Sequence, residues 1–216
     1  PTIIEIKTEI GFGATKAGTS SVHGSPLGQD IETVRKNLNW EYKPFEIPED
    51  VYNDFKEKVT NRGINKYNEW NKLLKDYQNK YPNDFQLFDE FINGKINIDL
   101  NDFKFDLEKP QATRNVSGKV IDILSAKYLN LIGGSADLAS STKAKGADGN
   151  FTINNRLGRN INYGVREHAM GAIANGIVLH KGLKTFTGAF FAFSDYMKPT
   201  LRLAAIMNIP TIFVFT

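Results

Sequence analysis

The chain has 216 residues, of which 41% are hydrophobic and 24% are charged, and its formal net charge at pH 7 is +3. This composition is typical of a globular protein with about one or two domains, so the disordered and fibrous classes are excluded. The positive charge is small and scattered, and it forms no basic stripe that would predict binding to nucleic acid.

The sequence contains no cysteine. A disulfide framework, a thiolate nucleophile and a zinc–thiolate site are therefore excluded, which fits a reducing compartment. No apolar run approaches the ~20 residues that a membrane-spanning helix needs, and no stretch resembles a signal peptide. We therefore expect a cytoplasmic protein whose partners include neither a membrane nor a nucleic acid.

Both ends of the chain have the pattern of buried strands. Residues 1–7 and 210–216 are short runs rich in Ile, Val and Phe. A natural domain seldom begins and ends in the middle of a sheet, because the cut strands would leave unpaired edges. We therefore expect the sequence to be an internal piece of a longer protein.

A glycine-containing turn and a polar loop follow the first predicted strand. The glycines of residues 10–18 have the wrong spacing for a dinucleotide-binding loop, and no helix follows them as a pyrophosphate would require. Residues 19–28 form a polar loop at the end of the strand, where loops often carry binding groups. His23 in this loop is a candidate for proton transfer, although a single loop histidine is more often simply exposed to solvent.

The next region is predicted to be helical. Asp30 is a candidate N-cap for a helix with Ile31, Val34 and Leu38 on its apolar face. Residues 48–109 are then rich in Lys, Glu, Asp, Asn and Tyr, with apolar residues at roughly helical spacing. We interpret this region as a solvated helical connector. Its aromatic residues are expected to anchor it on neighbouring domains, because no basic groove accompanies them as nucleic-acid stacking would require.

Two residues, Gly63 and Pro82, are expected to interrupt the connector, and a short helix is expected over residues 85–92. A second domain is predicted to begin near Pro110. In the second domain, Thr113 is a candidate helix cap.

The first strand of the second domain is predicted over residues 128–132. Gly133 and Gly134 permit a tight exit from this strand that brings the backbone close to a ligand. Asp137 at the strand end is either a ligand-binding carboxylate or the cap of a turn or helix. A long polar loop over residues 140–160 follows, of a length that is usually functional or mobile. Its basic residues are Lys143, Lys145, Arg156 and Arg159.

Residues 162–176 have the pattern of a strand exit leading into a buried helix, with Glu167 in the first helical turn. One interpretation is a carboxylate that favours the positive end of the helix dipole. The other is a catalytic carboxylate at the carboxyl end of a sheet, where open α/β proteins bind their ligands. The stretch alone leaves both open.

A strand over residues 184–187 and a turn at Gly188 lead into an aromatic cluster. Phe190, Phe193 and Tyr196 are spaced three residues apart, so they share one face at the start of a helix. Most such clusters belong to a hydrophobic core, and a planar aromatic ligand is the alternative partner.

Taken together and in this order, several of these stretches resemble the transketolase family. The resemblance covers nearly the whole chain, and five motifs in order are far more specific than any one of them. The stretches are Ile10–Gly13 with Val22–Leu27, Ala112–Arg114, Gly133–Leu138, Gly164–Gly171 and the aromatic cluster.

The resemblance implies an α/β, parallel-sheet thiamine-diphosphate-binding fold. Residues 1–47 would be the end of a diphosphate-binding domain, residues 48–109 the helical connector, and residues 110–216 the first half of a pyrimidine-binding domain. The implied activity is that of a transketolase in the pentose phosphate pathway. Such an enzyme reversibly transfers a two-carbon ketol unit from a ketose phosphate to an aldose phosphate, with thiamine diphosphate as cofactor.

The resemblance also implies roles for individual residues. Glu167 would be the carboxylate at ring nitrogen N1′ of the cofactor's aminopyrimidine, with a general acid–base role. Phe190, Phe193 and Tyr196 would form the aromatic pocket around that ring, fixing it and excluding water.

Further contacts to the cofactor and the sugar phosphate are implied in the same way. Ile10 and Leu138 would hold the bent shape of the cofactor, and Asp137 would lie near its positively charged thiazolium ring. His23 would bind the donor substrate and assist proton transfer. The groups implied to hold the sugar phosphate are Arg114 and Ser141.

Other family features would have to come from outside these residues. In the family, the diphosphate and its divalent cation, Mg²⁺ or Ca²⁺, are held by an upstream Gly-Asp-Gly segment and a following Asn, so no metal ligand is assigned here. Family members are homodimers whose cofactor lies between the diphosphate domain of one subunit and the pyrimidine domain of its partner. By that analogy His23 and Glu167 of one chain serve two different sites, and residues 1–216 alone are expected to be inactive.

Two alternatives to transketolase remain. A dihydroxyacetone synthase or a deoxyxylulose-phosphate synthase can share the Arg166–Glu167 motif, but the loop over residues 23–27 and Arg114 favour transketolase. The second alternative is a non-catalytic protein that keeps only the fold and the dimer surface. An upstream Gly-Asp-Gly segment would favour the enzyme over this last alternative.

Overall fold

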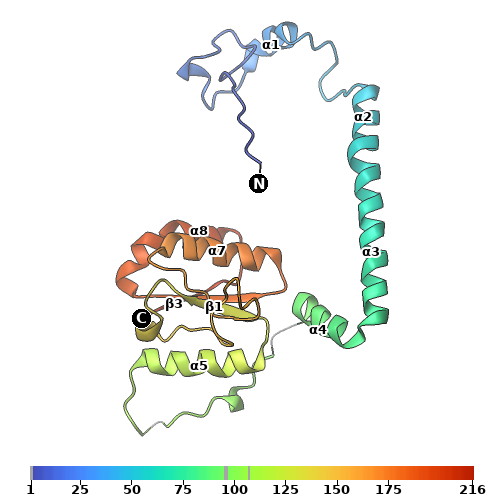
Figure 1. Ribbon diagram of the computed structural model, residues 1–216. Coiled ribbons are helices and arrows are strands. Elements are labelled where there is room, and N and C mark those ends of the chain that lie inside the picture. Colours follow the sequence, from blue (N-terminus) through green and yellow to red (C-terminus); the bar gives the residue numbers. More distant parts are fainter. Residues whose placement is uncertain (1, 95–96, 107) are drawn as a thin grey trace. The chain divides into compact units, whose positions relative to one another are not determined.

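The computed structural model of the chain describes residues 2–94, 97–106 and 108–216 (Figure 1). It divides into two compact units, Pro1–Leu74 and Lys75–Thr216, and the boundary between them falls inside a helix. Among the residues described, no helix is both long enough and apolar enough to cross a bilayer.

The first residues of the chain form no strand. Residues 2–9 lack regular secondary structure and are all exposed, with Ile3 97% and Ile6 75% exposed. The strand predicted over residues 1–7 is therefore wrong for residues 2–7, and residue 1 lies outside the described part. A strand is stable only when its backbone pairs with neighbours, and an apolar run does not by itself supply them.

Tight turns and one short helix make up the rest of this first segment. The 3₁₀ turns η1 (Ser20–Val22) and η2 (Gly28–Asp30) precede α1 (Ile31–Asn37). Asp30 is the N-cap residue of α1, as predicted, but its side chain does not cap the helix. The carboxylate instead accepts hydrogen bonds from the Thr15 backbone N at 2.8 Å and the Thr15 hydroxyl at 2.6 Å. These bonds, the hydroxyl first, hold the pKa of Asp30 below its usual range.

The connector begins with helical segments that follow one another directly. These are α2 (Glu49–Phe55), the π-helical η3 (Lys56–Asn61) and α3 (Arg62–Lys80). Gly63 therefore lies inside a helix, and the interruption predicted there is wrong. A glycine costs a helix only about 1 kcal/mol, which neighbouring helix-forming residues can offset.

The connector then turns at Pro82. Helix α4 (Pro82–Asn93) starts with this proline, which is favourable because the first helical residue needs no N–H. The helix expected over residues 85–92 is thus present and longer. A 3₁₀ turn, η4 (Leu100–Asp102), follows. None of α2, α3 or α4 contains a buried residue among those described, which matches the prediction of a solvated connector.

A parallel sheet organises the second unit. Its strands are β1 (Leu131–Ser135), β2 (Lys184–Ala189) and β3 (Ile212–Phe215), in the spatial order β1-β2-β3. Both strand pairs are parallel, with Gly134 opposite Thr187 in the first pair. The α/β class predicted from the sequence is therefore confirmed.

Strand β1 lies further along the chain than the strand predicted over residues 128–132. Tyr128 still belongs to the preceding helix as its C-cap, because its backbone N donates to the Leu124 carbonyl. The strand instead takes in Gly133 and Gly134. Glycine is a poor strand former on propensity alone, and the neighbouring backbone decides the outcome here.

Helices cover both faces of the sheet. Helix α5 (Thr113–Lys127) lies on one face, and α7 (Glu167–His180) and α8 (Lys198–Ile206) lie on the other (Figure 1). Thr113 is the first residue of α5 rather than its cap, which is Ala112. The core on the α5 side contains Ile121, Leu131, Ala144 and Phe186, and the core on the α7 side contains Ala136, Tyr163, Met170, Ala189 and Met197.

The glycines of β1 admit a second piece of backbone. The segment 159–163 runs beside β1: Gly133 N donates to Arg159 O at 3.1 Å, and Ile161 N donates to Gly133 O at 2.8 Å. A Cβ on Gly134 would lie 2.0 Å from the Ile161 carbonyl oxygen. The close backbone approach that we predicted for these glycines is present with protein backbone, and their proximity to a ligand stays a prediction.

Candidate functional site

A cavity of about 420 Å³ lies where β1 and β2 end and α7 begins. Three segments that are far apart in the sequence contribute to it: the turn after β1, the start of α7, and the 3₁₀ helix η5 (Phe191–Met197) after β2. This is the carboxyl edge of a parallel sheet, where α/β proteins bind their ligands. The lining residues are Ala136, Asp137, Leu138, Val165, Glu167, Phe193 and Tyr196.

Glu167 is the first residue of α7 and is half-buried in the cavity wall. The backbone that leads into α7 is tightly turned at Gly164, which has φ of 69°. A Cβ at Gly164 would lie 2.4 Å from the Arg166 guanidinium, which donates to the Tyr163 carbonyl at 3.1 Å. The positive φ favours glycine at this turn, and the turn places a carboxylate both at the positive end of a helix dipole and in a cavity.

The aromatic cluster forms a row along η5. Because a 3₁₀ helix has three residues per turn, side chains three apart lie in line. The Phe190 and Phe193 rings are stacked with centroids 6.1 Å apart, and Phe193 and Tyr196 are 6.3 Å apart. Phe193 and Tyr196 line the cavity, and Phe190 extends the row behind them.

Asp137 is exposed at the turn that follows β1 and has φ of 66°. An aspartate tolerates this left-handed conformation better than most residues, because its short polar side chain can bond locally. The N-cap of the next helix, α6 (Ala139–Thr142), is Leu138, so Asp137 is not a helix cap. Asp137 is one of the residues that line the cavity, and its role there stays a prediction.

Helix α6 is tied to the end of β1 by buried hydroxyl groups. The Ser135 and Thr142 hydroxyls lie 2.8 Å apart, and Ser135 also donates to the Ala144 carbonyl at 2.9 Å. Ser141 lies on this short helix and is half-buried, but it is not part of the cavity wall. Leu138, which precedes the helix, is part of it.

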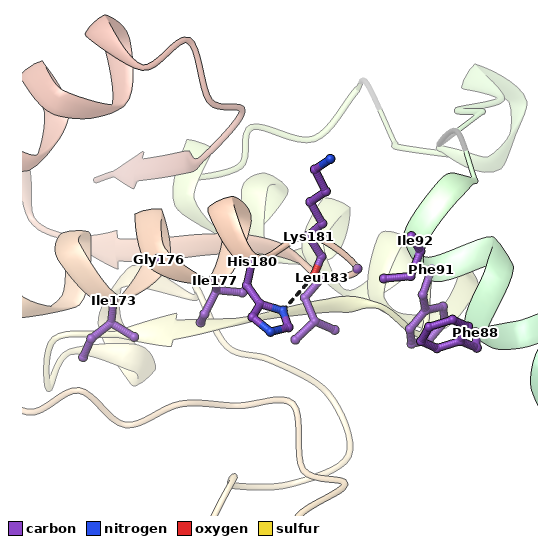
Figure 2. Close-up of a pocket in the computed structure, with 10 residues that line it drawn as sticks. Phe88, Phe91, Ile92, Ile173, Gly176, Ile177, His180, Lys181 and Leu183 are labelled. Atoms are coloured by element: carbon purple, nitrogen blue, oxygen red, sulfur yellow. Dashed lines mark hydrogen bonds between the residues drawn. The ribbon is translucent and has the colours of Figure 1, made fainter. Parts of the chain in front are cut away.

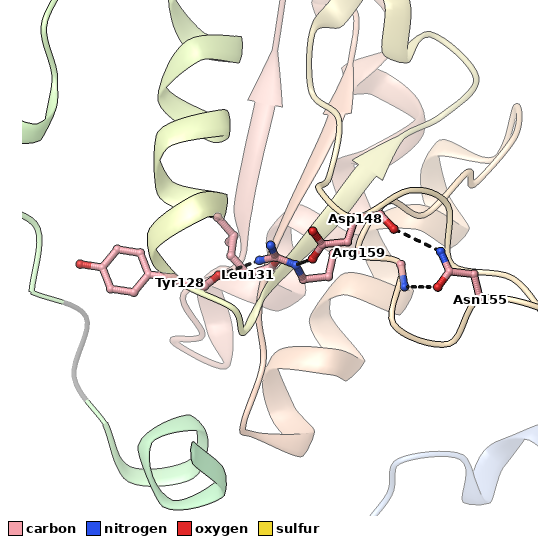
Figure 3. Close-up of polar contacts among 6 residues, drawn as sticks. Tyr128, Leu131, Asp148, Asn155 and Arg159 are labelled. Atoms are coloured by element: carbon pink, nitrogen blue, oxygen red, sulfur yellow. Dashed lines mark hydrogen bonds and ion pairs between the residues drawn. The ribbon is translucent and has the colours of Figure 1, made fainter. Parts of the chain in front are cut away.

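The long loop over residues 140–160 is fixed from within (Figure 3). Arg159 is buried, with 8% exposure, and its Nε donates to an Asp148 carboxylate oxygen at 2.5 Å. Its Nη1 donates to the Tyr128 carbonyl at 2.9 Å, at the end of α5. Nη1 also donates to the Leu131 carbonyl of β1 at 3.4 Å, so Arg159 joins the loop to the sheet and has a structural role. The sequence predicted that the loop containing Arg159 is functional or mobile. The burial of Arg159 was not predicted, because arginine is rarely buried unless it is paired.

The remaining predicted site residues, Arg114, Ile10 and His23, are exposed, each within its own unit. Arg114 is exposed at the start of α5. In the first unit, Ile10 is 47% exposed and its carbonyl accepts from Gly18 N at 2.8 Å, closing the predicted turn. His23 is exposed and follows η1.

Two lining residues, Ala136 and Val165, were not singled out from the sequence. Each lies within two positions of a predicted site residue, Asp137 or Glu167, and adjacency was the only available signal. A third residue, Tyr163, lies in the core next to the cavity, and burial raises its pKa to about 12.

A larger hollow of about 540 Å³ lies elsewhere in the second unit, between α4 and the end of α7 (Figure 2). Its walls are mainly apolar, with Phe91, Ile92 and Ile177 among them, and His180 at its edge. None of its lining residues that the structure describes carries a carboxylate, so the smaller cavity is the better candidate for chemistry. Across the described residues, no group of three or more His, Asp or Glu side chains is arranged to hold a metal ion.

The sheet topology and the position of the cavity are those of α/β domains that bind ligands at the carboxyl edge of a parallel sheet. Residues 1–97 match the family model described as transketolase, thiamine diphosphate binding domain. Residues 109–216 match the one described as transketolase, pyrimidine binding domain. The chain therefore belongs to the transketolase family.

Individual relatives agree with this assignment. The chain is 47% identical to a probable transketolase of Streptococcus pneumoniae and 45% identical to a transketolase of Geobacillus stearothermophilus. These matches cover 100% of the chain but only 34% and 33% of the relatives. The chain thus spans about a third of the length of the curated relatives that it matches.

Solved structures are similar as well. A transketolase from Leishmania mexicana has a TM-score of 0.81 and 32% identity, over 96% of this chain and 32% of that one. A Pichia stipitis transketolase in complex with sedoheptulose-7-phosphate has a TM-score of 0.82 and 32% identity, over 97% of this chain and 33% of that one.

Proposed function

We propose that the chain acts as part of a transketolase that moves a two-carbon ketol unit from a ketose phosphate to an aldose phosphate, in the pentose phosphate pathway. The observation that carries the proposal is the cavity that holds the Glu167 carboxylate together with Phe193 and Tyr196, in a chain of this family. The bound sedoheptulose-7-phosphate of the Pichia stipitis relative supports a sugar phosphate as substrate.

The cavity suits the aminopyrimidine ring of thiamine diphosphate. Its volume of about 420 Å³ exceeds what a single six-membered ring needs. The cavity therefore has room for the aminopyrimidine ring and for part of the thiazolium ring attached to it. Phe193 and Tyr196 offer aromatic faces for stacking, and Leu138 and Val165 offer apolar contacts. A planar ring with polar nitrogens at its rim matches such walls and a single helix-terminal carboxylate.

Glu167 would hold or share a proton at the ring nitrogen N1′, which is a general acid–base role. Thiamine diphosphate supplies, when bound, the nucleophilic carbon that carries the two-carbon unit. Phe190, Phe193 and Tyr196 would orient the ring and exclude water from it. The Asp137 carboxylate would favour positive charge on the neighbouring thiazolium ring.

The other assignments complete the proposal. Ile10 would contact the cofactor, and His23 would bind the donor substrate and assist proton transfer. Arg114 and Ser141 would bind the sugar phosphate, since a guanidinium suits an oxyanion.

We further propose the domain division 1–47, 48–109 and 110–216. In the proposed assembly, two copies form a homodimer with each site at the subunit interface. A Mg²⁺ or Ca²⁺ ion would be bound by residues beyond these 216. On this proposal, residues 1–216 alone do not form a complete site.

The test is Glu167→Gln in the full-length protein, which keeps the shape of the side chain and removes its charge and acid–base capacity. We expect kcat for ketol transfer to fall by about 10²–10⁴-fold, the usual contribution of a general acid–base group. Asp84→Asn is the matched control, because Asp84 is also a first-turn carboxylate, on α4.

Both variants lose a similar helix-dipole interaction, so only the first should lose turnover. Equal turnover of Glu167→Gln and wild type, with the oligomeric state unchanged by analytical ultracentrifugation, would show that Glu167 is merely a helix-terminal charge. Residues 1–216 alone should give no product in the same assay, and product formation would refute the need for groups outside them.

A further inference from the structure

The cavity depends on the spacing between two elements, α7 and η5. Glu167 begins α7, whereas Phe193 and Tyr196 lie on η5. Beneath the cavity, Met170 of α7 and Met197 of η5 are both 0% exposed and belong to the same core cluster. Any rotation of α7 against η5 would therefore change the distance between the carboxylate and the aromatic rings.

Helix α7 approaches the next helix, α8, very closely. A Cβ at Gly171 would lie 2.4 Å from the Thr200 hydroxyl oxygen and 3.0 Å from the Thr200 Cβ. The Thr200 hydroxyl donates to the Met197 carbonyl at 2.8 Å, which ties the start of α8 to the end of η5. This close contact and the apolar packing hold α7 against α8 and η5, but the apolar part of the attraction is non-directional.

A buried amide one turn further along α7 supplies a directional link. Asn175 is 5% exposed, and its Nδ2 donates to the Thr200 carbonyl at 2.9 Å. Its Oδ1 accepts from the Thr211 hydroxyl at 2.9 Å, just before β3. The Asn175 side chain on α7 is thus hydrogen-bonded to Thr200 of α8 and to Thr211, which precedes β3.

We propose that Asn175 is a positioning residue for the cofactor ring: its amide clamp fixes α7 so that Glu167 faces the ring bound by Phe193 and Tyr196. This inference rests on the proposed function. Hydrogen bonds depend on angle as well as distance, so the clamp adds a restraint on the rotation of α7 to the one that packing supplies. Asn175 lies about two helical turns from Glu167, and a rigid helix passes a change at one position to the other.

The test uses Asn175→Leu, which has a similar size and removes both hydrogen bonds, in the full-length protein. Asn130→Leu is the matched control. Asn130 is also buried, with 8% exposure, and donates to the Gly182 carbonyl at 3.2 Å. It precedes β1, so it lies at the opposite edge of the sheet from the cavity.

The measurements are the Kd for thiamine diphosphate by isothermal titration calorimetry, with the divalent cation saturating, and the Tm of each apo protein. We expect both variants to lower Tm, because each removes the side-chain hydrogen bonding of a buried asparagine. The Kd should rise roughly ten-fold for Asn175→Leu only, the size that a lost buried hydrogen bond brings. A merely structural role would lower the Tm and leave the Kd within about two-fold of the control.

If Asn175→Leu fails to fold, Thr211→Val removes only one bond of the clamp, and its expected Kd increase is about three-fold. A wild-type Kd in whichever of the two variants is folded overturns the inference and leaves the proposed function intact. Failure of the wild-type protein itself to bind thiamine diphosphate overturns the proposed function, and the inference with it.

Discussion

Residues 2–74 and residues 110–216 place their apolar side chains in opposite ways. Among the described residues of the first segment, Ala14 is the only buried one, and Phe12 and Phe55 are 69% and 61% exposed. In the second segment, Met170, Met197 and Phe186 are at most 1% exposed, between a sheet and its covering helices. About a third of residues 2–74 are hydrophobic, against nearly half of residues 110–216, so composition accounts for part of the difference.

The rest of the difference lies in what covers each apolar face. Periodicity in a sequence states which side of a helix or strand is apolar, and a core forms only where a second element covers that side. The segment 110–216 supplies both layers from its own residues, whereas the aromatic face of α3 is exposed in this chain. Three sets of variants test the contrast.

The largest effect is expected from Phe186→Ala. Phe186 is 1% exposed in the middle of β2, and truncating such a side chain costs about 3–5 kcal/mol. Phe55→Ala in α2, where the ring is 61% exposed, should cost less than about 0.5 kcal/mol.

Two probes separate the regions in this experiment. Both tryptophans, Trp40 and Trp70, lie in residues 2–74, so their fluorescence in a denaturant titration reports on that region. Native-state hydrogen exchange at residues 185–189 reports on the sheet. If the two variants lost hydrogen-exchange protection to a similar extent, the exposed Phe55 would contribute as much to stability as the buried Phe186, and the contrast would be wrong.

Substitutions of glycine should have opposite signs in the two regions. Gly134→Ala would bring a Cβ to 2.0 Å from the Ile161 carbonyl oxygen, and we expect a loss of about 1–3 kcal/mol. Gly63→Ala meets nothing within 4 Å and lies in a helix, so we expect a gain of about 0.4–1 kcal/mol. Thermal unfolding of both variants checks the signs, and a tolerated Gly134→Ala would argue against the close approach of segment 159–163.

The smallest effect concerns pH. Burial raises the pKa of Tyr163 to about 12. A raised pKa contributes stability that is complete below pH 10 and is lost as the pH rises toward 12. The Tyr163 hydroxyl is buried without a partner in the described structure, so Tyr163→Phe should cost nothing at neutral pH and remove part of the alkaline loss.

Asp30 in the first unit should have the opposite dependence. Its pKa is lowered, so its contribution is present above its ordinary pKa of 3.8 and is lost as the pH falls through the lowered value. Denaturant midpoints measured from pH 3 to pH 11 test both signs when wild type is compared with Tyr163→Phe on the alkaline side and with Asp30→Asn on the acid side. An unchanged alkaline slope in the variant would contradict the assignment to Tyr163.

Much of the second unit could be predicted from its sequence. The strand over residues 184–187, the strand near the C-terminal end and the start of α7 all follow from apolar periodicity and helix-start signals. The structure also brings Asp137, Glu167 and Tyr196 together around one cavity, as expected when loops leave the same edge of a sheet.

Other features depend on three-dimensional neighbours and left little trace in the sequence. Strand β1 includes two glycines because two other backbone segments approach it closely. Arg159 is buried because Asp148 and the Tyr128 carbonyl meet its guanidinium. The first apolar run is exposed because a strand needs neighbours that its own residues cannot provide.

The segment 159–163 has a consequence for solubility. Strand β1 is at one edge of the three-stranded sheet, and an open edge invites pairing with strands of other molecules. Backbone bonds from Gly133 N to Arg159 O and from Tyr163 N to Ser135 O use groups that would otherwise be available for such pairing. The loop held by Arg159 therefore covers the edge of β1 and disfavours aggregation by strand pairing there.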